Sequence, residues 1–201
     1  MRSAAILTNP ELPGLAAEVV DGYLHAPSTM VAEVIDGALS LLPRPRRQHA
    51  HAAGRLFGAL GPYSNPRGDD PGGWLILPEP ELHLGPRPDI VVPDLCGWRR
   101  ERIPDDFLAD DAPAHVELAP DWVCEVLSPR TEANDRAGKM RINRRERVGH
   151  VWLLSPSERT LEVYRLLGEL YVLVEVFEGG AEVRAEPFAE TALMLSAFWS
   201  L

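Results

Sequence analysis

The sequence predicts a single α/β (α+β) domain in which a mixed β-sheet is covered by helices. Three observations favour this fold. Strand-like and helix-like segments alternate through most of the chain, three strand-like segments follow one another near its end, and two segments are apolar almost throughout. Almost uniformly apolar strands are typical of a sheet covered on both faces, and consecutive strands are typical of an antiparallel meander.

The composition is that of an ordinary globular protein. The chain has 201 residues, of which 45% are hydrophobic and 25% charged, so it can bury one core and is short for two. No apolar run has the length of a signal-peptide core or of a membrane-spanning helix, which predicts a soluble, cytoplasmic protein. The net charge of −10 argues against indiscriminate charge-driven binding to nucleic acid, but it leaves room for a local basic surface.

The first predicted elements are a hairpin and a helix. Residues 31–42 read as two short strands around Asp36-Gly37, which is a strong hairpin-turn signal. A helix is expected over residues 48–60, and the Gly/Pro/Asp-rich stretch 61–73 ends it. The apolar residues at helical spacing in this helix are Ala50, Ala53, Phe57 and Leu60.

Strands dominate the rest of the chain. They are expected at residues 74–77, 81–84, 90–95, 122–127, 150–154, 160–166 and 170–177, of which the last three form the C-terminal meander. A second helix is expected over residues 134–148, ended by Gly149. Residues 103–121 form a long acidic loop, which in a compact domain is either functional or mobile. No repeat or linker divides the chain, so one domain is expected.

Two of the apolar strands contain one carboxylate each. Asp94 lies near the end of the segment IVVPDL, and Glu125 lies in the middle of WVCEVL. An unpaired carboxylate in a covered strand costs on the order of several kcal/mol. Each acid therefore needs a metal ion, a cation or hydrogen-bond donors as its partner. If both acids face one site, the strand period makes Cys96 point toward that site and Cys124 away from it, which disfavours a disulfide.

Lys139 is the only lysine among 20 basic residues. It lies in the second turn of the expected helix, about 7 Å from its start at the usual helical rise, so that its side chain can reach the strand ends. A surface ion pair with Asp135, four residues earlier, is the alternative role. An ammonium group is a compact donor that Arg cannot replace beside a water molecule at a metal site. A lone lysine in a chain that otherwise uses arginine therefore favours a functional role.

Five parts of the chain resemble a known protein family. They are GGWLILPEPELHLG, VVPDLCGWRRERIP, DWVCEVLSP, the spacing from Asp135 to Lys139, and VGHVWLLSP followed by TLEVYRL. In order and spacing they resemble the Uma-two family of restriction-endonuclease-like proteins, within the PD-(D/E)XK nuclease superfamily. The resemblance covers residues 31–199. It implies a restriction-endonuclease-like domain over residues 31–201, with residues 1–30 as an N-terminal extension.

The activity that the resemblance implies is Mg²⁺-dependent (or Mn²⁺-dependent) cleavage of DNA by an endonuclease. Asp94 and Glu125 correspond to the metal-binding acids, and Lys139 to the residue that assists the attacking water. The superfamily pattern has a Lys two residues after the second acid, where this chain has Leu127, so Lys139 is expected to have taken over that role. Cleavage of two strands would favour a homodimer.

Two other functions stay open. A catalytically inactive nuclease fold that binds a partner or nucleic acid is favoured by Leu127 and by the net negative charge. A metal-dependent hydrolase with another substrate is a third interpretation.

Several other residues are weaker candidates for the site. Pro88-Asp89 is a rival PD pair, but its place early in the expected strand makes Asp94 preferable. Three further residues are candidates for the site. His49 and Glu33 match positions of the family, and Glu81 lies on one face of the strand before Asp94. The candidates for contact with the DNA backbone, just after the Asp94 strand, are Arg99, Arg100 and Arg102. Further arginines cluster at residues 44–47 and 141–147, and each cluster taken alone is more typical of a solvated face.

Overall fold

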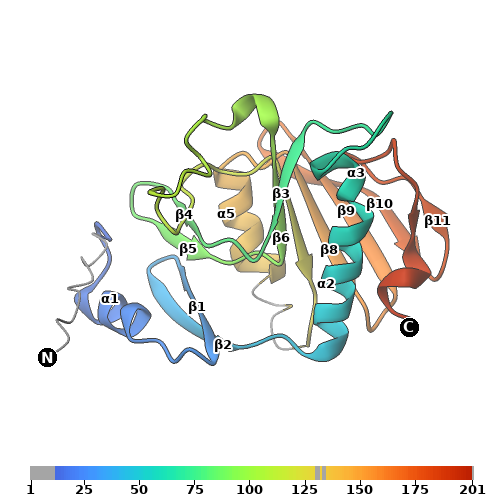
Figure 1. Cartoon of the computed structure of the whole chain (residues 1–201). Coiled ribbons are helices and arrows are strands. Elements are labelled where there is room, and N and C mark those ends of the chain that lie inside the picture. Colours follow the sequence, from blue (N-terminus) through green and yellow to red (C-terminus); the bar gives the residue numbers. More distant parts are fainter. Residues whose placement is uncertain (1–11, 130–131, 133–134, 201) are drawn as a thin grey trace, which may run out of the picture.

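The computed structural model describes residues 12–129, 132 and 135–200 (Figure 1). It contains a six-stranded sheet, a four-stranded sheet and a small two-stranded sheet. Helices cover the sheets, so the predicted mixed α/β architecture is confirmed. None of the helices in the described ranges is long and apolar enough to cross a membrane.

The six-stranded sheet has the strand order β10-β9-β8-β7-β6-β3. Its strands are β3 (Trp74–Pro78), β6 (Leu95–Arg99), β7 (Trp122–Val126), β8 (His150–Ser155), β9 (Thr160–Leu167) and β10 (Leu170–Glu178). Only β7 and β8 run parallel, and a helical segment connects them, as a parallel pair requires. The meander β8-β9-β10 is antiparallel, which confirms the predicted C-terminal arrangement.

The four-stranded sheet has the order β2-β1-β5-β4 and is antiparallel. Its strands are β1 (Met30–Ile35), β2 (Ala38–Pro43), β4 (Leu82–Leu84) and β5 (Asp89–Val91). The turn between β1 and β2 has positive φ at Asp36 (52°) and Gly37 (77°). This conformation is tolerated by Asp and Gly, and the predicted hairpin is confirmed.

The single strand expected over residues 90–95 is wrong. The chain leaves the four-stranded sheet at Val91 and enters the six-stranded sheet at Leu95. Pro93 lies in the connection, where the missing N–H of proline costs no ladder hydrogen bond. Asp94 therefore belongs to the passage between the two sheets, and the strand-face argument for its direction does not hold.

The helical elements are short apart from α2. They are α1 (Ala17–Leu24), α2 (Arg47–Ala59), α3 (Gly61–Ser64), the 3₁₀ turns η1 (Arg100–Arg102) and η3 (Leu195–Phe198), the π-helical turn η2 (Asp135–Lys139), and α5 (Met140–Arg145). Within the described residues the second predicted helix comprises the π turn η2 followed by α5 and ends at Arg145, and its predicted first residue lies outside them. The two-stranded sheet pairs β11 (Glu182–Val183) with β12 (Leu193–Met194).

Opposite faces of the six-stranded sheet carry two separate apolar cores. Figure 1 shows α2 in front of this sheet and α5 behind it. Leu56 of α2 belongs to the same core as Cys124, whereas Ile142 of α5 belongs to the same core as Cys96. The two buried thiols are free and lie on opposite faces, as the strand period predicts.

The face of α2 that is buried differs from the predicted one. Ala52 and Leu56 are fully buried within α2, and Leu60 follows them at its end. Phe57 is 36% exposed, although it was expected to share the apolar face. Leu60 is buried as predicted and Ala53 packs against the same core, so the prediction is wrong at Ala50 and Phe57, which are exposed.

A buried tyrosine links the aromatic core to the C-terminal segment. The Tyr63 hydroxyl donates to the Phe188 carbonyl (2.7 Å) and accepts from the Thr191 N–H (2.9 Å). Replacement of Tyr63 by Phe should lower the free energy of unfolding by about 1–2 kcal/mol, because both groups lose a buried partner. Urea denaturation measures this change, and an unaltered unfolding midpoint would contradict it.

Candidate active site

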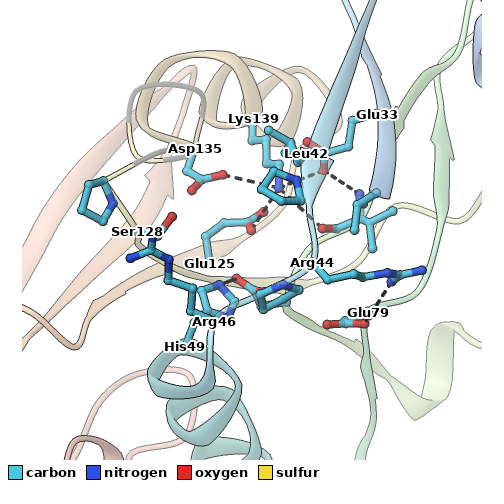
Figure 2. Close-up of a pocket in the computed structure, with 16 residues that line it drawn as sticks. Glu33, Leu42, Arg44, Arg46, His49, Glu79, Glu125, Ser128, Asp135 and Lys139 are labelled. Carbon is cyan, nitrogen blue, oxygen red and sulfur yellow. Dashed lines mark hydrogen bonds and ion pairs between the residues drawn. The ribbon is translucent and has the colours of Figure 1, made fainter. Parts of the chain in front are cut away.

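A pocket of about 330 Å³ lies where the β1–β2 hairpin, the start of α2 and the ends of β6 and β7 meet (Figure 2). Five carboxylates and one ammonium group line it: Glu33, Glu79, Asp94, Glu125, Asp135 and Lys139. The three residues of the predicted catalytic group, Asp94, Glu125 and Lys139, are thus brought together in one pocket. They come from three different parts of the chain.

The pairing of β6 with β7 places Asp94 beside Glu125. Leu95 is the pairing partner of Cys124, so the residue before Leu95 comes to lie next to the residue after Cys124. The Val126 N–H donates to Oδ2 of Asp94 at 2.7 Å, which fixes this carboxylate to the end of β7. Glu125 is only 3% exposed, so both acids border a space largely shielded from water.

Lys139 lies at the centre of the carboxylates, as Figure 2 shows. Its Nζ is 2.9 Å from Glu33 Oε1, 3.1 Å from Glu125 Oε2 and 3.4 Å from Asp135 Oδ1. The side chain is buried, which excludes the alternative of a surface pair with Asp135: that pair exists, but inside the pocket. Both residues belong to the π turn η2, and single π turns are frequent at functional sites.

Burial and neighbouring charges determine the ionisation of this group. Burial raises the pKa of Glu125 well above its usual value, Lys139 opposes this, and the nearby acids Asp135, Asp94 and Glu33 add to the increase. Burial alone would lower the pKa of Lys139, but the carboxylates around it outweigh burial and raise that pKa well above its usual value. Lys139 is therefore an ammonium ion and a hydrogen-bond donor, not a base.

His49 joins the site from the first turn of α2. Its Nε2 is 3.2 Å from Oδ2 of Asp94. Burial lowers the pKa of His49, but the hydrogen bond and charge of Asp94 outweigh burial, so the net shift is upward. Arg46, the residue before α2, lines the pocket as well, so the positive end of this uncapped helix borders it.

Two arginines at the pocket were not predicted to belong to the site. Arg44 and Arg46 line it from the connection between β2 and α2. Arg44 Nη1 lies 4.0 Å from Glu79 Oε2, and both side chains are about half exposed, so this contact is weak. The run of Pro and Arg over residues 43–47 was the available signal, but only the fold shows that it borders the acids.

Glu33 and Asp135 are buried at the site and both contact Lys139. Glu33 is 1% exposed and accepts from the Val92 N–H at 3.0 Å through the same oxygen that contacts Lys139. Its other oxygen, Oε2, is buried and has no hydrogen-bond partner within the described part of the chain.

Two other predicted acids lie outside this pocket. Glu81 contacts His83 (Oε1 to Nε2, 2.9 Å) and does not line the pocket. Asp89, the rival PD acid, accepts from the Asp36 N–H and from Arg145 Nη1, each at 2.6 Å. Asp89 therefore ties the hairpin turn to the helix after η2, which is a structural role.

The three arginines predicted to contact DNA lie at the other end of β6 from Asp94. The guanidinium of Arg99 stacks over Trp74 (4.3 Å), Arg100 donates to the Ser64 carbonyl (3.0 Å), and Arg102 donates to Asp121 Oδ1 (2.6 Å). None of the three lines the pocket. The structure gives them intramolecular partners and does not bring them to the acids, so their contact with DNA stays an untested prediction.

The composition of the pocket fits a divalent cation. Five carboxylates line the pocket together with the cations Lys139, Arg44 and Arg46, so the acids outnumber these cations even when one acid is protonated. Among the described residues, no group of three or more His, Cys, Asp or Glu side chains has the arrangement of a metal site. Mg²⁺ is usually held by one or two carboxylates together with water and substrate phosphates. Asp94 and Glu125 meet that requirement without a third protein ligand.

Comparison with known proteins points to a family of presumed nucleases. A family model described as "Putative restriction endonuclease", Uma2, matches residues 11–197. A solved structure described as a putative nuclease belonging to DUF820, from Anabaena variabilis ATCC 29413, superposes with a TM-score of 0.69 at 24% sequence identity; the match covers 89% of this chain and 96% of that one. No curated protein matches. With the family model matching nearly its whole length, the chain belongs to the Uma2 family.

Proposed function

We propose that this protein is a Mg²⁺-dependent or Mn²⁺-dependent DNA endonuclease that hydrolyses phosphodiester bonds at Asp94, Glu125 and Lys139. The observation that carries the proposal is the meeting of two carboxylates and one buried ammonium in a pocket bordered by arginines. The family match supports the same activity.

Asp94 and Glu125 are the residues that would hold the cation. A divalent cation in this position supplies a more acidic water and neutralises charge on the phosphate. Asp94 keeps its orientation through the Val126 N–H, so one carboxylate is already fixed before any ligand binds. The excess of acids would repel a phosphate group, which is why we expect cleavage to depend on the cation.

Lys139 assists the reaction as a donor. Water attacks phosphorus and gives up a proton to solvent, one P–O ester bond breaks, and the departing oxygen takes up a proton from solvent. The Lys139 ammonium donates to the attacking water or to a phosphate oxygen on which negative charge develops. Arg44, Arg46 and the first turn of α2 hold the neighbouring phosphates.

The direct test is cleavage of supercoiled and linear DNA by the purified chain with Mg²⁺ or Mn²⁺. We expect cleavage that a chelator abolishes and that Asp94→Asn reduces by roughly 100-fold or more, because loss of one group that stabilises the transition state costs about that much. Asp36→Asn, an exposed acid in the hairpin turn, is the matched control and should cleave like the wild type. Equal rates for the wild type and Asp94→Asn, or no cleavage of any DNA form, would contradict the proposal.

A catalytically inactive binding module is the second candidate. It is favoured by Leu127, which occupies the superfamily's usual Lys position and packs in the apolar core beneath α5, and by the internal pairing of Glu125 with Lys139. Titration calorimetry with Mn²⁺ separates the two functions. A binding module with a dead site should take up no metal, and Glu125→Gln should then change nothing.

A further inference from the structure

A second hollow adjoins the active-site pocket. It has a volume of about 470 Å³, and Tyr23 and the residues that follow α1 form its far wall together with Glu81. Four residues line both hollows: Val31, Arg44, Glu79 and Val92. The two hollows are therefore neighbours that share a wall, and we call them together the track.

The reactive groups lie deep in this track. Glu125 and Lys139 are 3% and 5% exposed, and the segment from Pro43 to Arg46 borders the mouth above them. A phosphodiester has to enter the pocket to reach these groups. The volume of this pocket is at the small end of the range for ligand sites. Enzymes that act on nucleic acid inside such a pocket take a single strand or an extruded nucleotide, because a paired strand carries its complement with it.

The track has few cationic side chains beside its carboxylates. Apart from Lys139 and His49, the cationic side chains that line the two hollows within the described ranges are Arg44 and Arg46. Tight binding to a duplex surface relies on many phosphate contacts, and two arginines supply few of them. Single-strand sites instead combine a few backbone contacts with aromatic side chains on which bases stack.

Tyr23 supplies an aromatic ring in the second hollow. It is partly buried, and its hydroxyl is hydrogen-bonded to Glu81. This contact holds the ring at the wall of the hollow next to the acids. A nucleotide bound at Asp94 would place its neighbour in the direction of this ring, because the two hollows meet at Val92 and Arg44.

We propose that the track takes a single strand of nucleic acid, with one nucleotide at Asp94 and Glu125 and a neighbouring base stacked on Tyr23. Single-stranded DNA, overhangs and frayed ends are then preferred over an intact duplex. The preference in cleavage rests on the nuclease function proposed above, whereas the preference in binding is measured independently of it.

Binding is measured by fluorescence anisotropy with a dye-labelled oligonucleotide, single-stranded or as the blunt duplex of the same sequence. The wild type is used with Ca²⁺, a hard cation that oxygen ligands also hold, and the strand is checked to be intact after each titration. We expect the single strand to bind at least ten-fold more tightly. With two arginines in contact with phosphates, the slope of log K against log salt should be about −1.4. Equal or tighter binding of the duplex, or no binding of either form, would overturn the proposal.

Variants of Tyr23 test the base site. Tyr23→Ala should weaken single-strand binding by about 5- to 150-fold, the range of one lost stacking contact, and Tyr23→Phe should restore it. Tyr164→Ala is the matched control, since Tyr164 also donates to a glutamate (Glu162 Oε2, 2.6 Å) but lines neither hollow. Unchanged binding by Tyr23→Ala would contradict the stacking site. Should Tyr23→Ala not fold, the ratio of single-strand to duplex affinity still decides.

Cleavage assays separate this proposal from the nuclease function. Cleavage of the duplex as fast as of the single strand would overturn the preference and leave the nuclease function standing. Selective binding of the single strand without cleavage of any DNA would support the track and contradict the nuclease function.

Discussion

Replacement of Lys139 by Met should lower the free energy of unfolding by about 3–5 kcal/mol, because breaking a buried ion pair leaves charge without a partner. The same change should reduce DNA cleavage roughly 100- to 1000-fold, the usual loss for one donor to the transition state. Both effects arise from one geometry: Nζ lies within 3.4 Å of three buried carboxylates. Methionine has a similar length and volume, so the change is mainly one of charge.

Denaturant unfolding and a cleavage assay measure the two effects on the same preparation. Arg141→Met is the matched control, because Arg141 is a cation of α5 whose side chain is 61% exposed and pairs with the equally exposed Asp36. It should change stability by less than about 1 kcal/mol. The stability lost in Lys139→Met should be smaller at acidic pH, where the abandoned carboxylates take up protons. A Lys139→Met protein as stable as the Arg141→Met protein would contradict the buried cluster.

The acids Asp94 and Glu125 were accessible from the sequence because each interrupts an apolar segment. A carboxylate in such a segment needs a partner, and that reasoning does not depend on the exact course of the chain. It survives the error over residues 90–95, which form two strands in two sheets joined through Pro93. The period of two along a strand predicts directions only while the strand is unbroken, and here it is broken at the residue of interest.

Glu33 could not be placed by local reasoning. It lies in a hairpin strand, more than 90 residues before Glu125, and reaches the site because β1 pairs with β5, which leads directly to Asp94. Such pairing between strands far apart in the chain depends on tertiary structure, and no spacing in the sequence encodes it. The same holds for Arg44 and Arg46, whose Pro/Arg segment looks like any solvated connection until its neighbours are known.

The role of Lys139 was the weakest part of the sequence interpretation and is the most changed by the structure. The sequence left a surface pair with Asp135, which helix spacing favours, as the alternative to the predicted functional role. The structure keeps that pair but buries it and adds Glu33 and Glu125 as further partners. The π turn in which both residues lie is not predictable from helix propensity, because it depends on packing against the sheets.

Replacement of Glu125 by Gln should abolish function but, unlike Lys139→Met, should leave the free energy of unfolding nearly unchanged. We expect Mn²⁺ binding to weaken at least about 100-fold, because a carboxylate ligand is lost, and DNA cleavage to fall to background. The free energy of unfolding should stay within about 1 kcal/mol of the wild type or rise. The amide oxygen can still accept a hydrogen bond from Lys139, and the change removes one negative charge from a cluster with an excess of negative charges. The raised pKa of Glu125, caused by burial and opposed by Lys139, has the same origin.

Titration calorimetry with Mn²⁺ and denaturant unfolding test this expectation, with Glu175→Gln on the exposed strand β10 as the matched control. The control should change neither metal affinity nor stability by a measurable amount. A Glu125→Gln protein that binds Mn²⁺ like the wild type would remove Glu125 from the metal site. One that is strongly destabilised would make its contact with Lys139 structural. A buried acid that binds a ligand contributes to function but not to stability. Its replacement is therefore expected to remove function and preserve stability.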